Sequence, residues 1–225
     1  MDNADARDVR ETYETIADHF AKTRAHPWPE VETFVERAES AAVGLDVGCG
    51  NGRHAAVLAE RADRVVALDA SRNLLEVARE RLGEPGARLV QGDATRLPLR
   101  TDSVGLAVYV ATLHHLPGRE RRIESLNELA RVLRADGSAL VSAWSTAHDR
   151  FDADPDAARG FDTTIDWTLP DGDVVPRFYH IYAPAEFEAD LEASELQVES
   201  VRVSSGNCYA EVRGQREGES ERKHP

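Results

Sequence analysis

The feature that most constrains the fold is a glycine-rich turn between an apolar run and a helical segment. The apolar run covers residues 41–47, and the turn reads Asp46-Val47-Gly48-Cys49-Gly50-Asn51-Gly52. Glycines let a backbone turn tightly and approach a ligand closely, and the helix after such a turn begins at the carboxyl edge of a sheet. The segment therefore predicts a strand, a ligand-binding loop and a helix over residues 53–61.

Apolar runs alternate with helical segments over the next hundred residues. Strands are expected at 64–68, 87–90, 104–110 and 138–144, with helices at 73–82 and 119–133. Such alternation is typical of parallel strands covered by helices on both faces. Residues 198–203 and 207–212 flank Ser204-Ser205-Gly206 and predict a hairpin. The expected fold is α/β: a doubly wound, Rossmann-like sheet of seven strands, mostly parallel, with an antiparallel strand in the C-terminal hairpin.

The segments outside the predicted sheet and its helices are expected to form a lid, an insertion and a tail. At 225 residues the chain is long enough for one α/β domain, expected over residues 1–213. Residues 1–40 predict a helical lid that is broken at His26-Pro27-Trp28-Pro29 and resumes over residues 30–39. The acidic segment 145–182 predicts a substrate-recognition insertion, mobile around 151–159, and the polar segment 214–225 predicts a disordered tail.

The charge balance is strongly acidic. The chain has 41 Asp and Glu residues against 27 Lys and Arg residues, a formal net charge of −14, and its only lysines are Lys22 and Lys223. This composition resembles that of halophilic archaeal proteins, whose acidic surfaces stay hydrated in concentrated salt. The acidity neither supports nor excludes nucleic-acid binding, which at high salt would depend on local arginines, stacking and shape.

Neither the apolar runs nor the cysteines indicate a membrane, secretory or metal-binding role. No apolar run is long enough to cross a bilayer, and the polar start MDNADARDVRE lacks the apolar core of a signal peptide. Cys49 and Cys208 have no CxxC or Cys/His ligand spacing, so neither a disulfide framework nor a metal site is expected. These observations predict a soluble, cytoplasmic protein.

Carboxylates stand at the ends of three successive predicted strands. Asp46 precedes the glycine loop, where it would repel a pyrophosphate and suits a cationic group. Asp69 ends the second strand and can accept hydrogen bonds from both hydroxyls of a ribose, although a helix-capping role is also open. Asp93 follows the third strand, where it would accept from an adenine amino group while the Ala94 N–H faces the ring. Together they predict a nucleoside ligand with a cationic group.

The motif series resembles the class I methyltransferases of the subgroup called type 11. Besides the stretches above, the resemblance rests on Ala67-Leu68-Asp69, Gly92-Asp93-Ala94, Leu97-Pro98 and Leu129 to Arg134, followed by Ala135-Asp136-Gly137 where the family usually has Pro-Gly-Gly. It implies S-adenosyl-L-methionine as cofactor, with Asp46 on its ammonium group. The expected cofactor-binding residues are Asp46, Gly48, Gly50, Asn51, Asp69, Asp93, Ala94 and Val110.

A narrower resemblance covers nearly the whole chain. It is to the tRNA wobble-uridine carboxymethyl methyltransferases, including the domain fused to an AlkB-type dioxygenase, and it rests on Tyr13 to Phe20, Thr23-Arg24, Pro27-Trp28-Pro29, Leu113 to Leu116, Arg119 to Ile123, Arg177 to Tyr182 and Gly206-Asn207. The family usually has Trp where this chain has Cys208, which removes one aromatic platform. The resemblance implies a tRNA substrate and a small zinc-binding activator protein as partner.

An acceptor carboxylate is already ionised at neutral pH, so its alignment with the methyl donor matters more than a general base. Five side chains are of types that could grip a carboxylate or nearby phosphates, or that are expected near the transfer centre: Arg24, His114, Arg177, His180 and Asn207. His115 could serve packing alone, and Trp28 and Tyr179 could belong to the core.

Two other functions stay open at this point. A type 11 methyltransferase for a small molecule, such as a quinone, sterol or natural-product precursor, would share every cofactor motif. A non-catalytic binding subunit with this fold would not need the intact carboxylates and glycines. The first differs from the tRNA hypothesis only at Arg24, Pro27-Trp28-Pro29 and residues 177–180.

Overall fold

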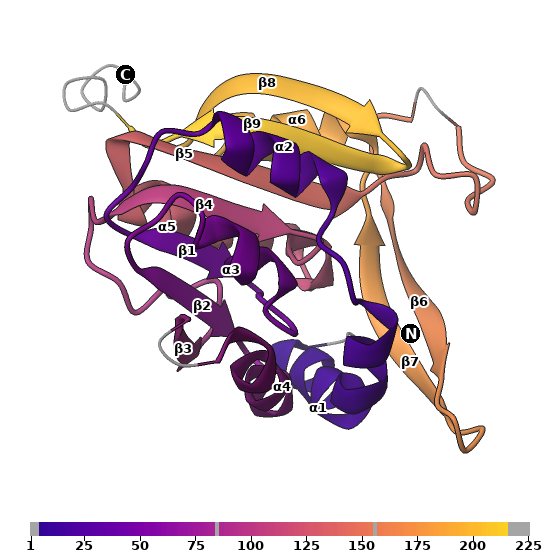
Figure 1. Cartoon of the computed structure of the whole chain (residues 1–225). Coiled ribbons are helices and arrows are strands. Elements are labelled where there is room, and N and C mark those ends of the chain that lie inside the picture. Colours follow the sequence, from indigo (N-terminus) through magenta and orange to yellow (C-terminus); the bar gives the residue numbers. More distant parts are fainter. Residues whose placement is uncertain (1–4, 84–85, 155–156, 216–225) are drawn as a thin grey trace.

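A seven-stranded sheet forms the centre of the protein (Figure 1). The structure is a computed structural model, which describes residues 5–83, 86–154 and 157–215. The strand order is β3-β2-β1-β4-β5-β9-β8. The strands are β1 (Gly44–Val47), β2 (Val65–Asp69), β3 (Arg88–Gln91), β4 (Val104–Val110), β5 (Leu133–Trp144), β8 (Gln197–Ser204) and β9 (Asn207–Arg213). Strand β9 runs antiparallel to both β5 and β8, and the other neighbouring pairs are parallel, so the predicted fold class is confirmed.

Helices cover both faces of the sheet. The helices are α1 (Ala6–Thr23), α2 (Pro29–Arg37), α3 (Arg53–Leu58), α4 (Arg72–Leu82), α5 (Arg119–Val132) and α6 (Pro184–Glu192), with a short 3₁₀ turn η1 (Leu113–His115). Apolar side chains of α5 and α6 pack on one face, and those of α2, α3 and α4 pack on the other. The central strands β1, β2 and β4 between these layers are mainly apolar and buried, as expected for strands covered on both faces.

The lid helix α1 lies against α4 at the carboxyl edge of the sheet (Figure 1). Glu14 fixes this position, because its carboxylate accepts hydrogen bonds from the backbone N–H groups of Arg72 and Asn73, both at 2.8 Å, and from the hydroxyl of Ser71 at 3.0 Å. These groups belong to the first turn of α4, whose N–H groups have no partner within the helix. One lid helix thus caps a helix of the main domain.

The insertion contains a hairpin that the sequence analysis did not predict. Strands β6 (Phe161–Thr168) and β7 (Val174–Ile181) pair with each other and stand apart from the main sheet (Figure 1). The polar residues Asp162, Thr164 and Asp166 alternate with less polar ones, a period-2 pattern that would have identified β6. Within the predicted mobile segment 151–159, residues 155–156 lie outside the described residues, as do residues 216–225 of the predicted tail.

Among the described residues, no helix has the length and apolar character needed to cross a membrane.

Candidate active site

A cavity of about 360 Å³ opens at the carboxyl ends of the parallel strands, between the glycine loop, the lid helix α1 and the β6–β7 hairpin. Most of the predicted site residues line it: Arg24, Gly48, Gly50, Asn51, Asp69, Asp93, Ala94, Val110, His114, Arg177 and Asn207. Asp46 and His180 are not among the residues that line it. The topology therefore brings eleven of the thirteen predicted residues to one cavity.

The glycine loop is held by its own backbone and by strand β2. Gly48 has φ +71°, and a side chain there would place its Cβ 2.2 Å from Oγ1 of Thr112. The N–H groups of Gly48 and Cys49 both donate to the carbonyl of Leu68, at 2.8 and 2.9 Å. No residue other than glycine satisfies both the positive φ and the close approach of the chain after β4.

Asp69 connects the loop to the end of β2. Its Oδ2 accepts from the N–H of Gly50 at 2.8 Å, and its Oδ1 accepts from the N–H of Ser71 at 2.9 Å. Burial raises the pKa of Asp69 to about 6, while these two hydrogen bonds oppose the rise. A carboxylate can accept about four hydrogen bonds, so Asp69 has capacity left for two ribose hydroxyls.

Asp46 lies beneath the glycine loop and is 1% exposed. Its Oδ2 is buried and has no hydrogen-bond partner. Burial, and then the charge of Asp69, raise the pKa of Asp46 to about 7. A buried carboxylate without a full set of partners is stabilised by a cation, so the charge of Asp46 suits the predicted ammonium group, although Asp46 does not line the cavity.

Asp93 lies at the third strand end and is paired within the protein. Its Oδ1 accepts from both the N–H and the hydroxyl of Thr95 at 2.9 Å, and its Oδ2 forms an ion pair with Arg121 at 2.9 Å. Burial opposes ionisation here, but these contacts lower the pKa of Asp93 below its ordinary value. The carboxylate is therefore ionised and held in the cavity wall beside Ala94.

Asn51 has a contact that its motif position did not predict. Its side-chain amide donates to the carbonyls of Arg24, at 2.9 Å, and Ala21, at 3.3 Å. These carbonyls belong to the end of α1, so the glycine loop holds the lid over the cavity. Asn207 lines the cavity at the start of β9, and its amide donates to the carbonyl of Ser205 at 3.0 Å.

The two histidines after β4 are buried and have fixed hydrogen-bonding roles. Nδ1 of His114 accepts from the N–H of Trp144 at 2.8 Å, so the neutral ring carries its proton on Nε2. His115 lies 3.0 Å from the carbonyl of Phe178 through Nδ1 and 2.8 Å from the Tyr13 hydroxyl through Nε2. Burial holds the pKa of His114 well below its usual value and lowers that of His115 to about 3. His115 thus joins the lid, η1 and β7.

Arg177 is the most unusual side chain in the cavity wall. It is 6% exposed, its Nε is buried without a hydrogen-bond partner, and it forms no ion pair with any described carboxylate. Its guanidinium lies over the rings of Trp167, at 4.6 Å, and Tyr179, at 5.2 Å. A buried charge without a counter-ion is costly, and the rings of Trp167 and Tyr179 offset part of that cost.

Trp167 also contacts the second arginine of the cavity. The guanidinium of Arg24 lies 5.7 Å from the centre of the Trp167 ring and 5.4 Å from that of Phe20. The indole N–H of Trp167 donates to Nδ1 of His19 at 3.1 Å. Trp167 was not among the predicted residues. It lies in β6, and the unpredicted hairpin is what carries it to the lid.

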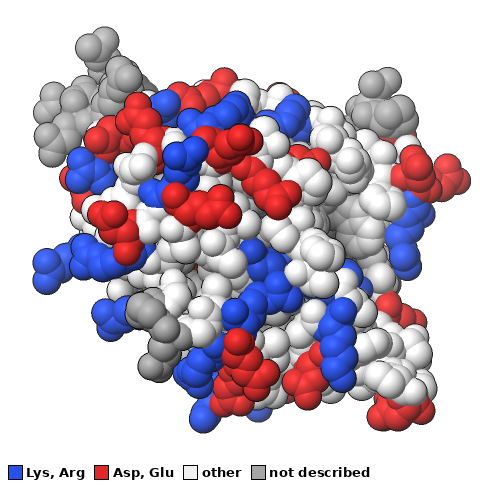
Figure 2. All heavy atoms as spheres, in the orientation of Figure 1, with Lys and Arg blue, Asp and Glu red and all other residues white. Residues whose placement is uncertain are grey.

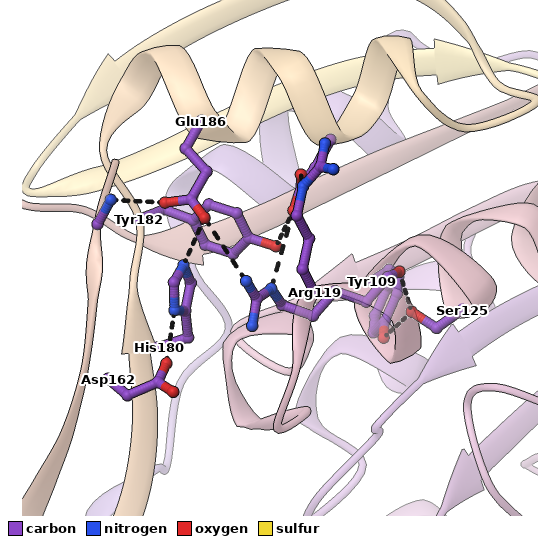
Figure 3. A network of polar contacts seen from close by, with 10 residues as sticks. Tyr109, Arg119, Ser125, Asp162, His180, Tyr182 and Glu186 are labelled. Atoms are coloured by element: carbon purple, nitrogen blue, oxygen red, sulfur yellow. Dashed lines mark hydrogen bonds and ion pairs between the residues drawn. The ribbon is translucent and has the colours of Figure 1, made fainter. Parts of the chain in front are cut away.

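His180 lies on the opposite face of the hairpin from Arg177. Residues an odd number apart on a strand point to opposite faces, and the sequence analysis had not recognised 174–181 as a strand. Nδ1 of His180 pairs with Asp162 at 2.7 Å, and its Nε2 lies 3.2 Å from Glu186 of α6 (Figure 3). This placement disagrees with the prediction that His180 grips the acceptor.

The cluster around His180 anchors the hairpin to the main domain (Figure 3). Glu186 also accepts from the N–H of Gly160 and lies 3.6 Å from Arg122 of α5. Asp190 of α6 is fully buried, pairs with Arg119 at 2.6 Å and accepts from the hydroxyl of Tyr182 at 3.1 Å. The base of β7 is thereby fixed to α5 and α6, which determines where Arg177 enters the cavity.

Comparison with known proteins identifies the catalytic class. The family model described as a methyltransferase domain matches residues 45–141, which run from β1 to β5 and include all three strand-end carboxylates. Residues 45–141 form a methyltransferase domain, and the fold around them is that of the class I enzymes. The predictions of this family and of S-adenosylmethionine as its cofactor are confirmed.

Two curated relatives of the chain carry the same activity in their names. The tRNA (carboxymethyluridine(34)-5-O)-methyltransferase ALKBH8 of Mus musculus is 36% identical over 137 residues, covering 61% of this chain and 20% of the mouse protein. The protein of that activity from Saccharomyces cerevisiae is 31% identical over 175 residues, covering 75% of this chain and 59% of the yeast protein. The methyltransferase thus spans less than two thirds of the length of these relatives.

Solved structures confirm the fold at low sequence identity. A chain of the DhpI-SAM-HEP complex matches with a TM-score of 0.71 and 22% identity, covering 93% of the methyltransferase and all of that chain. A chain in the complex between the Haloferax volcanii Trm112 methyltransferase activator and the putative methyltransferase matches with a TM-score of 0.68 and 14% identity, covering 92% and 98%.

Proposed function

We propose that the methyltransferase esterifies the carboxylate of 5-carboxymethyluridine at the wobble position of tRNA, giving the methyl ester. The observation that carries the proposal is Arg177, a buried guanidinium in the cavity wall without a described carboxylate partner. A carboxylate acceptor would supply that partner. The names of the mouse and yeast relatives support the choice of nucleotide.

S-adenosylmethionine supplies an electrophilic methyl group on a positively charged sulfur. The residues of the chain have to hold the acceptor oxygen in line with that methyl group and exclude water. Arg177 and Arg24 would grip the acceptor carboxylate, with Trp167 keeping the two guanidinium groups apart and oriented. Because an ionised carboxylate has no proton to lose, the absence of an assigned general base is consistent with this chemistry.

His114 would serve as a neutral hydrogen-bond donor near the acceptor. Its Nδ1 is already occupied by the N–H of Trp144, and its low pKa keeps the ring uncharged. A neutral imidazole can donate from Nε2 without withdrawing as much charge from the acceptor oxygen as a cation would. His180 is proposed to act through the hairpin, by positioning Arg177, since it lies on the other face of β7.

The test is transfer of a radiolabelled methyl group from S-adenosylmethionine to two tRNA preparations, one carrying 5-carboxymethyluridine and one lacking it. Label is expected only in the first tRNA, and mild alkali should release it because methyl esters hydrolyse. Alkali-stable label, or equal label in both preparations, would falsify the ester assignment.

A partner is part of the proposal. We propose that a small zinc-binding activator pairs with an exposed edge of the sheet, supported by the resemblance of the fold to a chain from a complex with such an activator. Strand β3 is one edge of the sheet, and its Leu89 and Val90 are half-buried. Co-expression with the activator of the same organism should give a stable one-to-one complex with higher activity. Full activity of the isolated, monodisperse chain would contradict the requirement for an activator.

A further inference from the structure

Basic side chains gather on one part of this acidic protein. In Figure 2, Lys and Arg atoms collect in the middle of the face and continue below it, there with acidic groups beside them, over the region where α1, α3 and α4 lie in Figure 1. Acidic and basic groups alternate over the upper part of the same face. For a chain with a net charge of −14, a local excess of arginine indicates an anionic ligand.

Two of these arginines converge on one short segment at the rim of the cavity. Arg53, the first residue of α3, donates to the carbonyl of His26 at 3.4 Å. Arg81, near the end of α4, donates to the carbonyls of Ala25, at 2.8 Å, and Arg24, at 3.5 Å. Neither arginine forms an ion pair within the described residues. A guanidinium carries five N–H donors, so both keep donors for a further partner.

The arginines of this group repel one another. The pKa of Arg53 is lowered to about 10, first by burial and then by the charge of Arg24, with a further contribution from Arg81, and the charge of Asp46 offsets these effects only in part. Arg53 is also held over the ring of Trp28, at 5.6 Å, so it cannot easily move away from its neighbours. An anion between Arg53 and Arg81 would relieve this repulsion.

We propose that Arg53 and Arg81 bind a backbone phosphate of the RNA substrate, next to the nucleotide whose base lies at Arg177. Arg177 is buried in the wall, Arg24 and Arg53 are half-buried where the cavity opens, and Arg81 is exposed outside the cavity lining. The four arginines therefore run from the acceptor site to the surface. Two guanidinium forks suit the oxygens of a phosphodiester. The cofactor carboxylate is the weaker alternative, because Arg81 lies outside the cavity.

This inference rests on an RNA substrate, as proposed above, but its test does not require methyl transfer. The probe is an unmodified RNA stem–loop of anticodon-arm length, and binding is measured by anisotropy over a series of KCl concentrations. Arg81→Gln should weaken binding on the order of tenfold at low salt and reduce the slope of log K against log[KCl] by about 1. Arg53→Gln should have an effect of the same kind.

Two controls separate phosphate binding from a structural role. Arg64→Gln removes an exposed arginine before β2, at the opposite edge of the sheet, and should leave RNA affinity unchanged. Arg81→Lys keeps the charge but loses the two-pronged grip of the guanidinium, so it should keep the salt slope of the original chain and bind RNA with an affinity between those of the original and of Arg81→Gln.

Three results would overturn the proposal: an unchanged salt slope in Arg81→Gln, an Arg81→Lys variant whose salt slope falls as it does in Arg81→Gln, or a loss of affinity for S-adenosylmethionine that matches the loss for RNA. Any of these can occur while the ester is still formed on tRNA, so they do not bear on the proposed function. A failure to form the ester, with an intact effect on RNA binding, would overturn only that function.

Discussion

The cofactor side and the acceptor side of the cavity consist of different kinds of chemical groups. On the cofactor side, formed by Gly48, Gly50, Asp69 and Asp93, backbone N–H groups and carboxylates come from three neighbouring strand ends within about fifty residues. On the acceptor side, formed by Arg24, His114, Arg177 and Tyr179, the side chains come from the lid, the turn after β4 and the hairpin. One side is local in sequence, and the other is assembled by tertiary contacts.

The two sides also carry opposite unbalanced charges. Burial raises the pKa values of Asp46 and Asp69 on the cofactor side, whereas Arg177 on the acceptor side is buried without a described carboxylate partner. Each side therefore matches a ligand of opposite charge, a cation near the glycine loop and an anion near the hairpin. The comparison indicates that binding of the cofactor and recognition of the acceptor can be disturbed separately.

Arg177→Ala is expected to give the largest difference between the effect on methyl transfer and the effect on cofactor affinity. Removing the guanidinium leaves the acceptor carboxylate without its main contact, so methyl transfer to tRNA carrying 5-carboxymethyluridine should fall by roughly 100-fold. Affinity for S-adenosylmethionine, measured by calorimetry, should change less than twofold. If methyl transfer and affinity for S-adenosylmethionine fall together, the cofactor side and the acceptor side are coupled and do not act separately.

Asp69→Ala should give the opposite pattern. The ribose hydroxyls lose a buried acceptor, and Gly50 and Ser71 lose the partner of their N–H groups, so S-adenosylmethionine should bind more weakly by roughly 1–3 kcal/mol. RNA affinity of the cofactor-free chain should stay constant. Unchanged cofactor affinity on titration would refute the assignment of Asp69.

Trp167→Ala tests whether the hairpin and the lid act together. Trp167 contacts both Arg177 and Arg24, and each contact of this type stabilises by about 1 kcal/mol. The turnover rate on tRNA should fall about tenfold, with little change in cofactor affinity. Trp167→Phe keeps an aromatic face and should restore most of the rate, whereas a purely structural role would give both variants the same loss of thermal stability and of activity.

Asp46→Asn tests the protonation state of the buried carboxyl group that precedes the glycine loop. The ordinary pKa of this carboxyl is 3.8, and burial raises the pKa of Asp46 to about 7, so the folded chain keeps a proton that the unfolded chain releases near pH 4. The stability contributed by this group is therefore lost as the pH rises through 7. The stability of the variant relative to the original chain, measured without cofactor by urea unfolding, should increase by about 1 kcal/mol from pH 6 to pH 8. A difference that does not depend on pH would show that Asp46 is ionised throughout.

The sequence predicted the cofactor side of the cavity more accurately than the acceptor side. The strands, the glycine loop and the carboxylates at 46, 69 and 93 could be read from the chain, because each depends on neighbours within a few residues. The hairpin β6–β7 could not be recognised among acidic residues, although Asp171-Gly172 and the alternation before it are signals for one. Because the strand was not recognised, Arg177 and His180 were both expected to grip the acceptor.

The sequence by itself determined the order of the elements and the glycines of the loop, since local sterics and backbone hydrogen bonding decide these, and the resemblance of its motifs to a family indicated the cofactor. Only the tertiary structure decided which side chains share the acceptor site. Tyr13, His115 and Phe178 meet across 165 residues of chain, Trp167 comes to rest between two arginines, and His180 is turned towards Glu186. The physical reason is that a buried charge or ring is fixed by the groups packed around it, and those groups are distant in sequence.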